Sequence, residues 1–212
     1  MNVIARVKAR ELTGYRALAA SLMGAALTAV CAQISFHLPG NPVPVTMQVF
    51  AAVLCGMALG GKLGALSQIE YLAAGLAGAP VFADFKAGPA AIAGPTGGYI
   101  VGFILAALVV GLVAERSRRT FAHRCVAGFL GVAVIYTFGR AWFAVWLGEL
   151  TGVRSWLLGV APFVGVDAAK VMLAAAISSQ RKSFRAEQRG VEESAFRATP
   201  RGRKADSSLR SE

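Results

Sequence analysis

Long apolar runs separated by short polar or glycine-rich segments dominate the chain. Six runs stand out, at about residues 16–35, 47–61, 63–79, 98–115, 123–148 and 155–179, and the second is short and bounded by glycines. A helix of about 20 apolar residues spans the hydrocarbon core of a bilayer. The pattern therefore predicts an all-α integral membrane protein in which residues 16–180 form six transmembrane helices.

The distribution of basic residues predicts the orientation of these helices, because Lys and Arg concentrate on the cytoplasmic side of membrane proteins. If both termini are cytoplasmic, only Lys86 and Arg154 fall in outer loops, Arg140 and Lys170 lie within helices, and the other basic residues lie on the inner side. The opposite orientation reverses this bias. We therefore expect a multi-pass protein of the cell membrane with both termini in the cytoplasm, and residues 1–15 forming a basic cytoplasmic segment.

Composition supports this interpretation and removes one alternative. Hydrophobic residues make up 56% of the chain and charged residues 16%, against roughly 25% charged residues in soluble domains. The net charge of +11 would suit a nucleic-acid-binding protein, but the basic residues are placed as topology signals, so we expect no nucleic-acid partner. Residues 181–212 mix acidic and basic side chains without apolar periodicity, which predicts a disordered cytoplasmic tail that contacts membrane lipid.

Asp167 and Lys170 are charged residues inside the last apolar run. Residues three apart share one face of a helix, so the carboxylate and the ammonium point in the same direction. Each charge costs on the order of 2.5 to 3.5 kcal/mol in hydrocarbon, so both face the protein interior. Two interpretations follow: a ligand clamp with one acceptor and one donor, or a self-neutralising pair that only fixes helix packing.

Other chemistry is sparse in the sequence. His37 and His123 stand far apart and the three cysteines occur singly, so no metal site is expected. The segment from Gly56 to Lys62 matches the start of a P-loop, but Leu63 follows where Ser or Thr is required and an apolar run precedes it. We interpret this segment as a tight turn between two helices.

Glu70 and Arg140 are two further charged residues within predicted helices. They could pair with each other between the third and fifth helices. A small intramembrane enzyme using Glu70, Asp167 and Lys170 as acid and base groups is an alternative from a different functional class, but it would need a nucleophile or a metal that the sequence does not offer. We therefore expect no catalytic residues and no cofactor.

Two irregular segments fall on the predicted outer side. The first, Pro39–Thr46, contains three prolines in six residues, which makes it stiff and non-helical. The second runs from Pro80 to Gly98 and ends in a glycine-rich stretch that allows close backbone approach. Both are too apolar for ordinary solvated connections, so we expect them to form lids or walls over a cavity, with a position on the membrane interface as the alternative.

Four motifs occur together and carry a family resemblance: VPVTMQ at residues 43–48, GAPVF at 78–82, GPTGGY at 94–99, and the Asp167-x-x-Lys170 pair. In this order and at these intervals they resemble the BioY family, the biotin-specific substrate-binding S components of energy-coupling factor (ECF) transporters. The resemblance extends from about Ala20 to Ile177. It implies the six-helix S-component fold, with biotin held near the outer face.

The resemblance also implies which residues bind the ligand. Asp167 and Lys170 match the pair that faces the ureido ring of biotin, and Lys86 corresponds to a polar position near the valerate carboxylate. Gln48 and Tyr99 match pocket-lining positions, and we expect Gly97 and Gly98 of the GPTGGY motif to contact the ligand as well. Trp142 could pack on the bicyclic ring of the ligand, with an interface belt or core packing as the alternative. Some relatives place an arginine where this chain has Ile100, which gives Lys86 more weight as the partner of the carboxylate.

Partners follow from the same resemblance. S components of this type deliver their substrate with a transmembrane coupling protein and two ATPase subunits, and they dock on the coupling protein through small residues of the first helix. Ala25 and Ala29 show the required spacing of four. The expected function is high-affinity biotin uptake at the outer face, with an S component for another vitamin as the alternative within the same class.

Overall fold

The computed structural model describes residues 3–116, 120–149 and 152–180. By its internal contacts the chain divides into two compact units, residues 1–176 and residues 177–212. The structure discussed below belongs to the first unit, apart from residues 177–180 at the end of the last helix. The predicted disordered tail, residues 181–212, lies outside the described residues.

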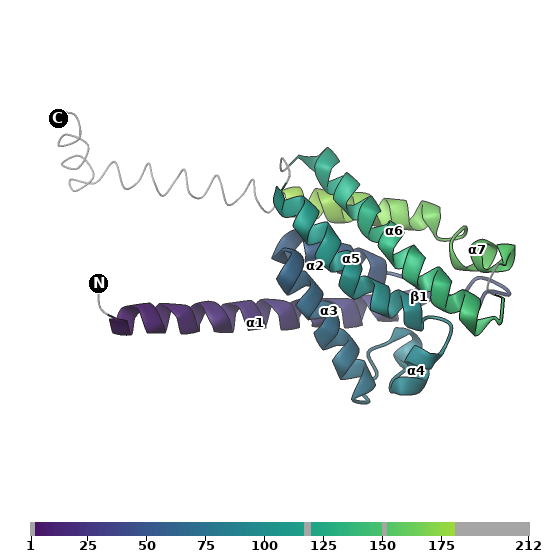
Figure 1. The fold of residues 1–212 in the computed structure, drawn as a ribbon, viewed down its shortest axis with the longest axis horizontal. Helices are drawn as coiled ribbons and strands as arrows, with labels where there is room; N and C mark the ends of the chain where they lie inside the picture. The colour runs from purple at the N-terminus through teal and green to yellow at the C-terminus, as the bar shows by residue number, and fades with distance from the viewer. Residues whose placement is uncertain (1–2, 117–119, 150–151, 181–212) are drawn as a thin grey trace. The chain divides into compact units, whose positions relative to one another are not determined.

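Helices make up nearly all of the regular structure, as the apolar runs predict (Figure 1). The longer ones are α1 (Val3–Gln33), α2 (Gln48–Leu59), α3 (Gly61–Leu76), α5 (Gly97–Arg116), α6 (Phe121–Trp146) and an unlabelled last helix, Val164–Gln180. The shorter ones are the 3-10 turn η1 (Ala83–Phe85), α4 (Pro89–Ala93) and α7 (Val153–Gly159). Helices α5 and α6 lie side by side, and their contact is the most extensive one among the labelled elements.

The prediction of six full-length spans is only partly met. Within the described residues, Gly14–Gln33, α5 and α6 are long and apolar enough to cross a membrane, and α7 with the last helix would make a fourth, bent span. Helix α2 has 12 residues and α3 has 16, which at 1.5 Å per residue is shorter than the hydrocarbon core of about 30 Å. The two apolar runs are therefore helical, but each helix is shorter than the prediction required.

Glycine at the connection between α2 and α3 explains where these helices end. Gly60 has φ of 87°, a conformation that side-chain-bearing residues rarely adopt, and it ends α2 and precedes α3. The backbone N–H of Gly61 donates a hydrogen bond of 3.1 Å to Glu115 Oε1 from the end of α5. A carboxylate of the chain itself thus occupies the start of α3, in agreement with the interpretation of the P-loop-like sequence as a turn.

The last predicted span is broken, and Pro162 accounts for the break. The run 155–179 was expected to be one helix, but α7 ends at Gly159 and the last helix begins at Val164 at an angle of 46°. Proline lacks a backbone N–H, and its ring clashes with the carbonyl four residues earlier. The bend therefore leaves carbonyl groups at the end of α7 without helical partners.

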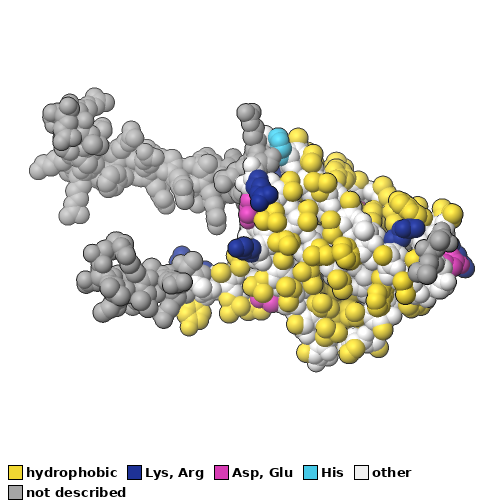
Figure 2. All heavy atoms as spheres, viewed as in Figure 1, with side chains coloured by type: hydrophobic (Ala, Val, Ile, Leu, Met, Phe, Trp, Pro, Cys, Tyr) yellow, Lys and Arg dark blue, Asp and Glu magenta, His cyan; other side chains and the backbone are white. Residues whose placement is uncertain are grey.

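The centre of the core is formed by α2, whose residues are buried on almost every side. Ala51, Ala52 and Val53 have no exposed surface. A helix that is apolar all round is typical of a position surrounded by other helices. On the face drawn in Figure 2, hydrophobic side chains cover most of the described surface and charged side chains lie toward its two ends, as expected for a protein embedded in lipid.

The two irregular segments lie next to each other at the end of α1. Loop one, residues 34–47, contains a small antiparallel ladder of β1 (Ser35–Phe36) and β2 (Val45–Thr46) on either side of the proline-rich stretch. Loop three, residues 77–96, contains η1 and α4. The side chain of Gln33, at the end of α1, holds loop three by donating to the carbonyls of Val81 and Phe82 and accepting from the N–H of Phe85.

Candidate ligand-binding site

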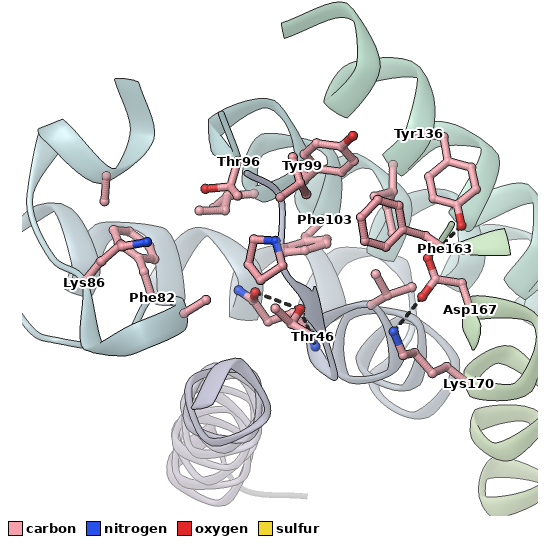
Figure 3. A pocket seen from close by; sticks show the side chains of 18 residues that line it. Thr46, Phe82, Lys86, Thr96, Tyr99, Phe103, Tyr136, Phe163, Asp167 and Lys170 are labelled. Carbon is pink, nitrogen blue, oxygen red and sulfur yellow. Dashed lines mark hydrogen bonds and ion pairs between the residues drawn. The ribbon is translucent and has the colours of Figure 1, made fainter. Parts of the chain in front are cut away.

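A cavity lies between loop one, loop three, α5, α6 and the last helix (Figure 3). About 670 Å³ of space lies between its lining atoms, and this volume includes the open mouth. Most of its wall is apolar or aromatic, and polar groups occur at a few positions. The lining residues include Thr46, Gln48, Phe82, Lys86, Tyr99, Phe103, Tyr136, Phe163, Asp167 and Lys170.

The Asp167–Lys170 pair lies at one side of the cavity and is almost completely buried, with exposures of 2% and 5%. Lys170 Nζ donates to Asp167 Oδ1 at 2.7 Å, and the hydroxyl of Tyr136 from α6 donates to Asp167 Oδ2 at 2.7 Å. A carboxylate can accept about four hydrogen bonds and an ammonium can donate three. Capacity therefore remains on both groups for a ligand that offers donors and an acceptor side by side.

The side chains of loop one and α2 form a second polar part of the wall. Gln48 donates to the hydroxyl of Tyr71 at 2.7 Å and accepts from Thr46 at 3.0 Å, and Tyr71 donates to the carbonyl of Val81 in loop three. These bonds hold both loops against the helices. The Gln48 amide is thus already engaged on both its oxygen and its nitrogen.

Lys86 lies on the opposite side of the cavity from Asp167, as Figure 3 shows. Its ammonium forms an ion pair of 3.0 Å with Asp84 Oδ2 in the same loop. Asp84 also accepts from Ser35 and lies 3.4 Å from His37 Nε2. Partial burial alone would raise the pKa of Asp84, but the hydrogen bond and the charge of Lys86, helped by Ser35 and His37, lower that pKa below its ordinary value.

The broken end of α7 is tied to the cavity wall by two side chains. The amide of Asn41 donates to the carbonyl of Leu158 at 2.8 Å, and the hydroxyl of Tyr99 donates to the carbonyl of Gly159 at 2.6 Å. These are carbonyls that the bend at Pro162 leaves without helical partners. The bend therefore fixes loop one and α5 against the segment that carries Phe163 and Asp167 into the cavity.

Five of the eight predicted binding residues line this cavity: Gln48, Lys86, Tyr99, Asp167 and Lys170. The other three, Gly97, Gly98 and Trp142, do not line it; they form a close helix contact beside it. A Cβ atom at Gly98 would lie 2.5 Å from the carbonyl oxygen of Phe138 and would collide with Trp142. The indole of Trp142 donates to the carbonyl of Gly94 at 2.9 Å, so these residues act in packing.

Ala25 and Ala29, the predicted docking positions, are partly buried against the protein's own core. The outward surface of α1 instead carries large side chains, among them Leu22, Met23 and Val30. Small residues allow close helix contact within one chain as well as between chains. On α1 that contact includes Gly24, Ser21 and Thr28, which face α3.

The hypothesis that Glu70 pairs with Arg140 is wrong. Glu70 accepts a hydrogen bond of 2.8 Å from Ser21 of α1, and the Arg140 guanidinium lies 5.6 Å from the ring centre of Trp156 in α7. Glu70 is also absent from the wall of the cavity that contains Asp167 and Lys170. The three groups of the alternative intramembrane enzyme therefore do not converge. Among the residues that the structure describes, no three His, Cys, Asp or Glu side chains cluster as metal ligands would.

Two residues of the site carry no signal that sequence reasoning could use. Tyr136 is an ordinary aromatic residue within a long apolar run, and only the packing of α6 on the last helix brings it to Asp167. Asn41 stands in a proline-rich loop, where it would normally indicate a turn. Its bond to Leu158 joins residues 117 positions apart, and local sequence does not predict such a contact.

The site is an apolar cavity with a buried ion pair at one side and a cation at the other, and it lies among helices that can cross a bilayer. These features define a membrane protein that binds a small molecule with polar groups at its ends. The chain belongs to the BioY family, whose family model matches residues 5–187.

Individual relatives agree with this assignment. The chain is 40% identical over 163 residues to a protein of Thermotoga maritima named biotin transporter BioY, which covers 77% of this chain and 94% of that protein. It is 41% identical over 155 residues to a probable biotin transporter BioY of Pyrococcus horikoshii, covering 73% and 89% of the two chains. Its fold is similar to a crystal structure of the S-component for biotin from an ECF-type ABC transporter, with a TM-score of 0.72, 22% identity and coverage of 86% and 95%. These relatives are named as transporters and not as enzymes.

Proposed function

We propose that this chain is the biotin-binding S component of an ECF-type transporter, which captures biotin at the outer face of the cell membrane for import. The observation that carries the proposal is the buried Asp167–Lys170 pair, held by Tyr136 in the wall of an otherwise apolar cavity. The names of the relatives support the same substrate. The proposed role is binding and delivery, without chemistry on the substrate.

The ureido ring of biotin suits the Asp167–Lys170 pair. Its two N–H groups are donors for the carboxylate and its carbonyl is an acceptor for the ammonium. Hydrogen bonds to charged groups contribute about 1.5–3 kcal/mol each when they form in a site sheltered from water. The aromatic wall of Phe103, Phe163 and Tyr99 would then cover the apolar faces of the ring system.

The valerate carboxylate of biotin would extend toward Lys86. The cavity wall contains two basic side chains, Lys86 and Lys170, and Lys170 is already paired with Asp167. In this arrangement Gln48 and Tyr99 would shape the wall, because their polar atoms are bonded to Tyr71, Thr46 and the carbonyl of Gly159.

Six membrane crossings with both termini in the cytoplasm remain our proposed topology. The distribution of basic residues and the six longer helices support it, and the short helix α2 is surrounded by protein, so it does not need to match the bilayer by itself. A reporter enzyme fused at either end of the chain would give cytoplasmic activity under this topology and periplasmic or external activity under the opposite one.

The proposed partners are a transmembrane coupling protein and two ATPase subunits. The described residues contain no nucleotide-binding loop, and the P-loop-like sequence is a turn in which the N–H of Gly61 donates to Glu115. Purification of the chain from its own cells at native expression level would recover these subunits. Ala25 and Ala29 stay a predicted part of the contact, to be tested by replacing each with leucine and measuring the amount of coupling protein recovered.

Calorimetry on the purified protein tests the substrate. We expect tight binding of biotin and of desthiobiotin, which keeps the ureido ring, and weaker binding of a vitamin that lacks a cyclic urea. Micromolar or weaker binding of both ureido compounds would refute the proposal. Lys86→Ala should weaken biotin more than the uncharged biotin amide, and equal losses for the two would remove Lys86 from the carboxylate site.

A further inference from the structure

Loop three contains a turn that places the carboxylate of Asp84 next to Lys86, the cation at one side of the cavity. Asp84 and Phe85 have φ of 60° and 55°, the left-handed conformation that residues other than glycine, Asn and Asp rarely adopt. The turn is held from outside the loop, because the N–H of Phe85 donates to the side chain of Gln33 at 3.2 Å. The result is that the Asp84 carboxylate lies within 3.0 Å of the Lys86 ammonium, two residues further along.

Asp84 has three partners, and only one of them belongs to the cavity. Lys86 lines the cavity, whereas Ser35 and His37 lie in loop one outside its wall. Asp84 can therefore release Lys86 and still keep a hydroxyl donor and an imidazole beside it. The lowered pKa of Asp84 agrees with a carboxylate that is ionised at neutral pH.

We infer that Asp84 competes with the ligand for Lys86. Asp84 neutralises this lysine until the carboxylate of a ligand displaces Asp84, and Asp84 thereby sets the selectivity of the site between charged and uncharged ligands. The inference rests on the proposed function, because it takes the biotin carboxylate as the group that reaches Lys86. An anionic ligand must replace one ion pair by another. An uncharged ligand leaves the Asp84–Lys86 pair in place.

The size of the effect follows from the exposure of the pair. The side chains of Lys86 and Asp84 are 61% and 31% exposed, so the pair is a surface ion pair and its removal is worth a small factor in affinity. Replacing Asp84 by asparagine removes the competing charge, keeps an acceptor for Ser35, and suits the left-handed conformation equally well. We expect Asp84→Asn to tighten biotin binding about two- to fivefold at low salt and to leave binding of biotin amide unchanged.

The test is a set of calorimetric titrations with biotin and biotin amide on the full chain. Glu149→Gln is the matched control, because Glu149 is also an acid in an exposed ion pair, 3.7 Å from Arg154, and it lies outside the cavity wall. It should leave both affinities unchanged. The tightening caused by Asp84→Asn should disappear when Lys86→Gln is introduced as well, and should shrink in 1 M salt, where charges are screened within about 3 Å.

Three results would overturn the inference. Weaker biotin binding by Asp84→Asn, or an equal shift in the affinities for biotin and its amide, would mean that Asp84 only stabilises the loop. Persistence of the tightening in the Lys86→Gln background would mean that Asp84 acts on another group. Failure of the wild-type chain to bind biotin would instead remove the proposed function, and the inference with it, so the two failures are distinguishable.

Discussion

Replacing Asp167 by asparagine keeps the size and shape of the side chain and removes its charge. In the free protein this leaves the Lys170 ammonium, 5% exposed, without its counter-ion at 2.7 Å. Removing one partner of a buried ion pair costs about 3–5 kcal/mol of stability. We therefore expect a lower midpoint of thermal unfolding whether or not the pair binds a ligand.

The effect on binding separates the two interpretations of the pair. A hydrogen bond to a charged acceptor contributes about 1.5–3 kcal/mol and one to a neutral acceptor about 0.5–1.5 kcal/mol. If one or two ureido N–H groups bind Asp167, the variant loses about 1–3 kcal/mol of binding, a rise in Kd of roughly 5- to 150-fold. Calorimetry with biotin at a temperature well below unfolding measures this rise.

Tyr136→Phe is the companion variant, because it removes the 2.7 Å hydrogen bond to Asp167 and keeps both charges. We expect a smaller loss of affinity than for Asp167→Asn, since the carboxylate would lose its fixed orientation but not its charge. If Asp167→Asn lowered the unfolding temperature and left the Kd of biotin unchanged within about twofold, the pair would be a packing device and the clamp interpretation would be refuted.

Further predictions concern the parts of the chain that support the cavity. Asn41→Ala should lower stability by about 1–3 kcal/mol, because a carbonyl of α7 and an N–H of loop one lose their partner; an unchanged unfolding temperature would contradict this role. Gly98→Ala should destabilise the contact of α5 with α6 by about 1–3 kcal/mol, whereas Gly165→Ala, with open space around it, should be neutral in the same unfolding assay. Because the pKa of Asp84 is lowered, its stabilising contribution is present above the unfolded pKa of about 3.9 and is lost as the pH falls through the lower, folded value. The protection of loop-three amides, relative to their intrinsic exchange rates, should thus fall only in that acid range, and Asp84→Asn should remove this fall.

Much of the fold could be predicted because hydropathy is a local property. The apolar runs at 98–115 and 123–148 correspond closely to α5 and α6. The length of α2 could not be read in the same way, because a helix surrounded by protein is as apolar as one that faces lipid. The break at residues 160–163 had a visible cause in Pro162, but proline also occurs inside continuous membrane helices, so the residue alone did not decide the outcome.

Part of the site could also be predicted from the sequence. Two charges three residues apart in an apolar helix must face the interior for energetic reasons, and Asp167 and Lys170 are buried as expected. Gly97, Gly98 and Trp142 were expected to contact the ligand, but none of them lines the cavity. Gly98 packs against Phe138 and Trp142 of α6, and Gly97 packs against Ile92 of α4. A glycine that lets a ligand approach and a glycine that lets a helix approach have the same sequence signature.

The sequence by itself determined that this chain is a helical membrane protein with an interior-facing ion pair and two stiff loops, because apolar length, charge cost and proline geometry are properties of short segments. Only the tertiary structure decided that Tyr136 donates a hydrogen bond to Asp167, that Asn41 and Tyr99 donate to the carbonyls exposed by the bend, and that Asp84 faces Lys86. The first two depend on contacts between residues far apart in the chain, and the third on a left-handed turn that Gln33 holds from another element. Such contacts exist only after the helices have packed.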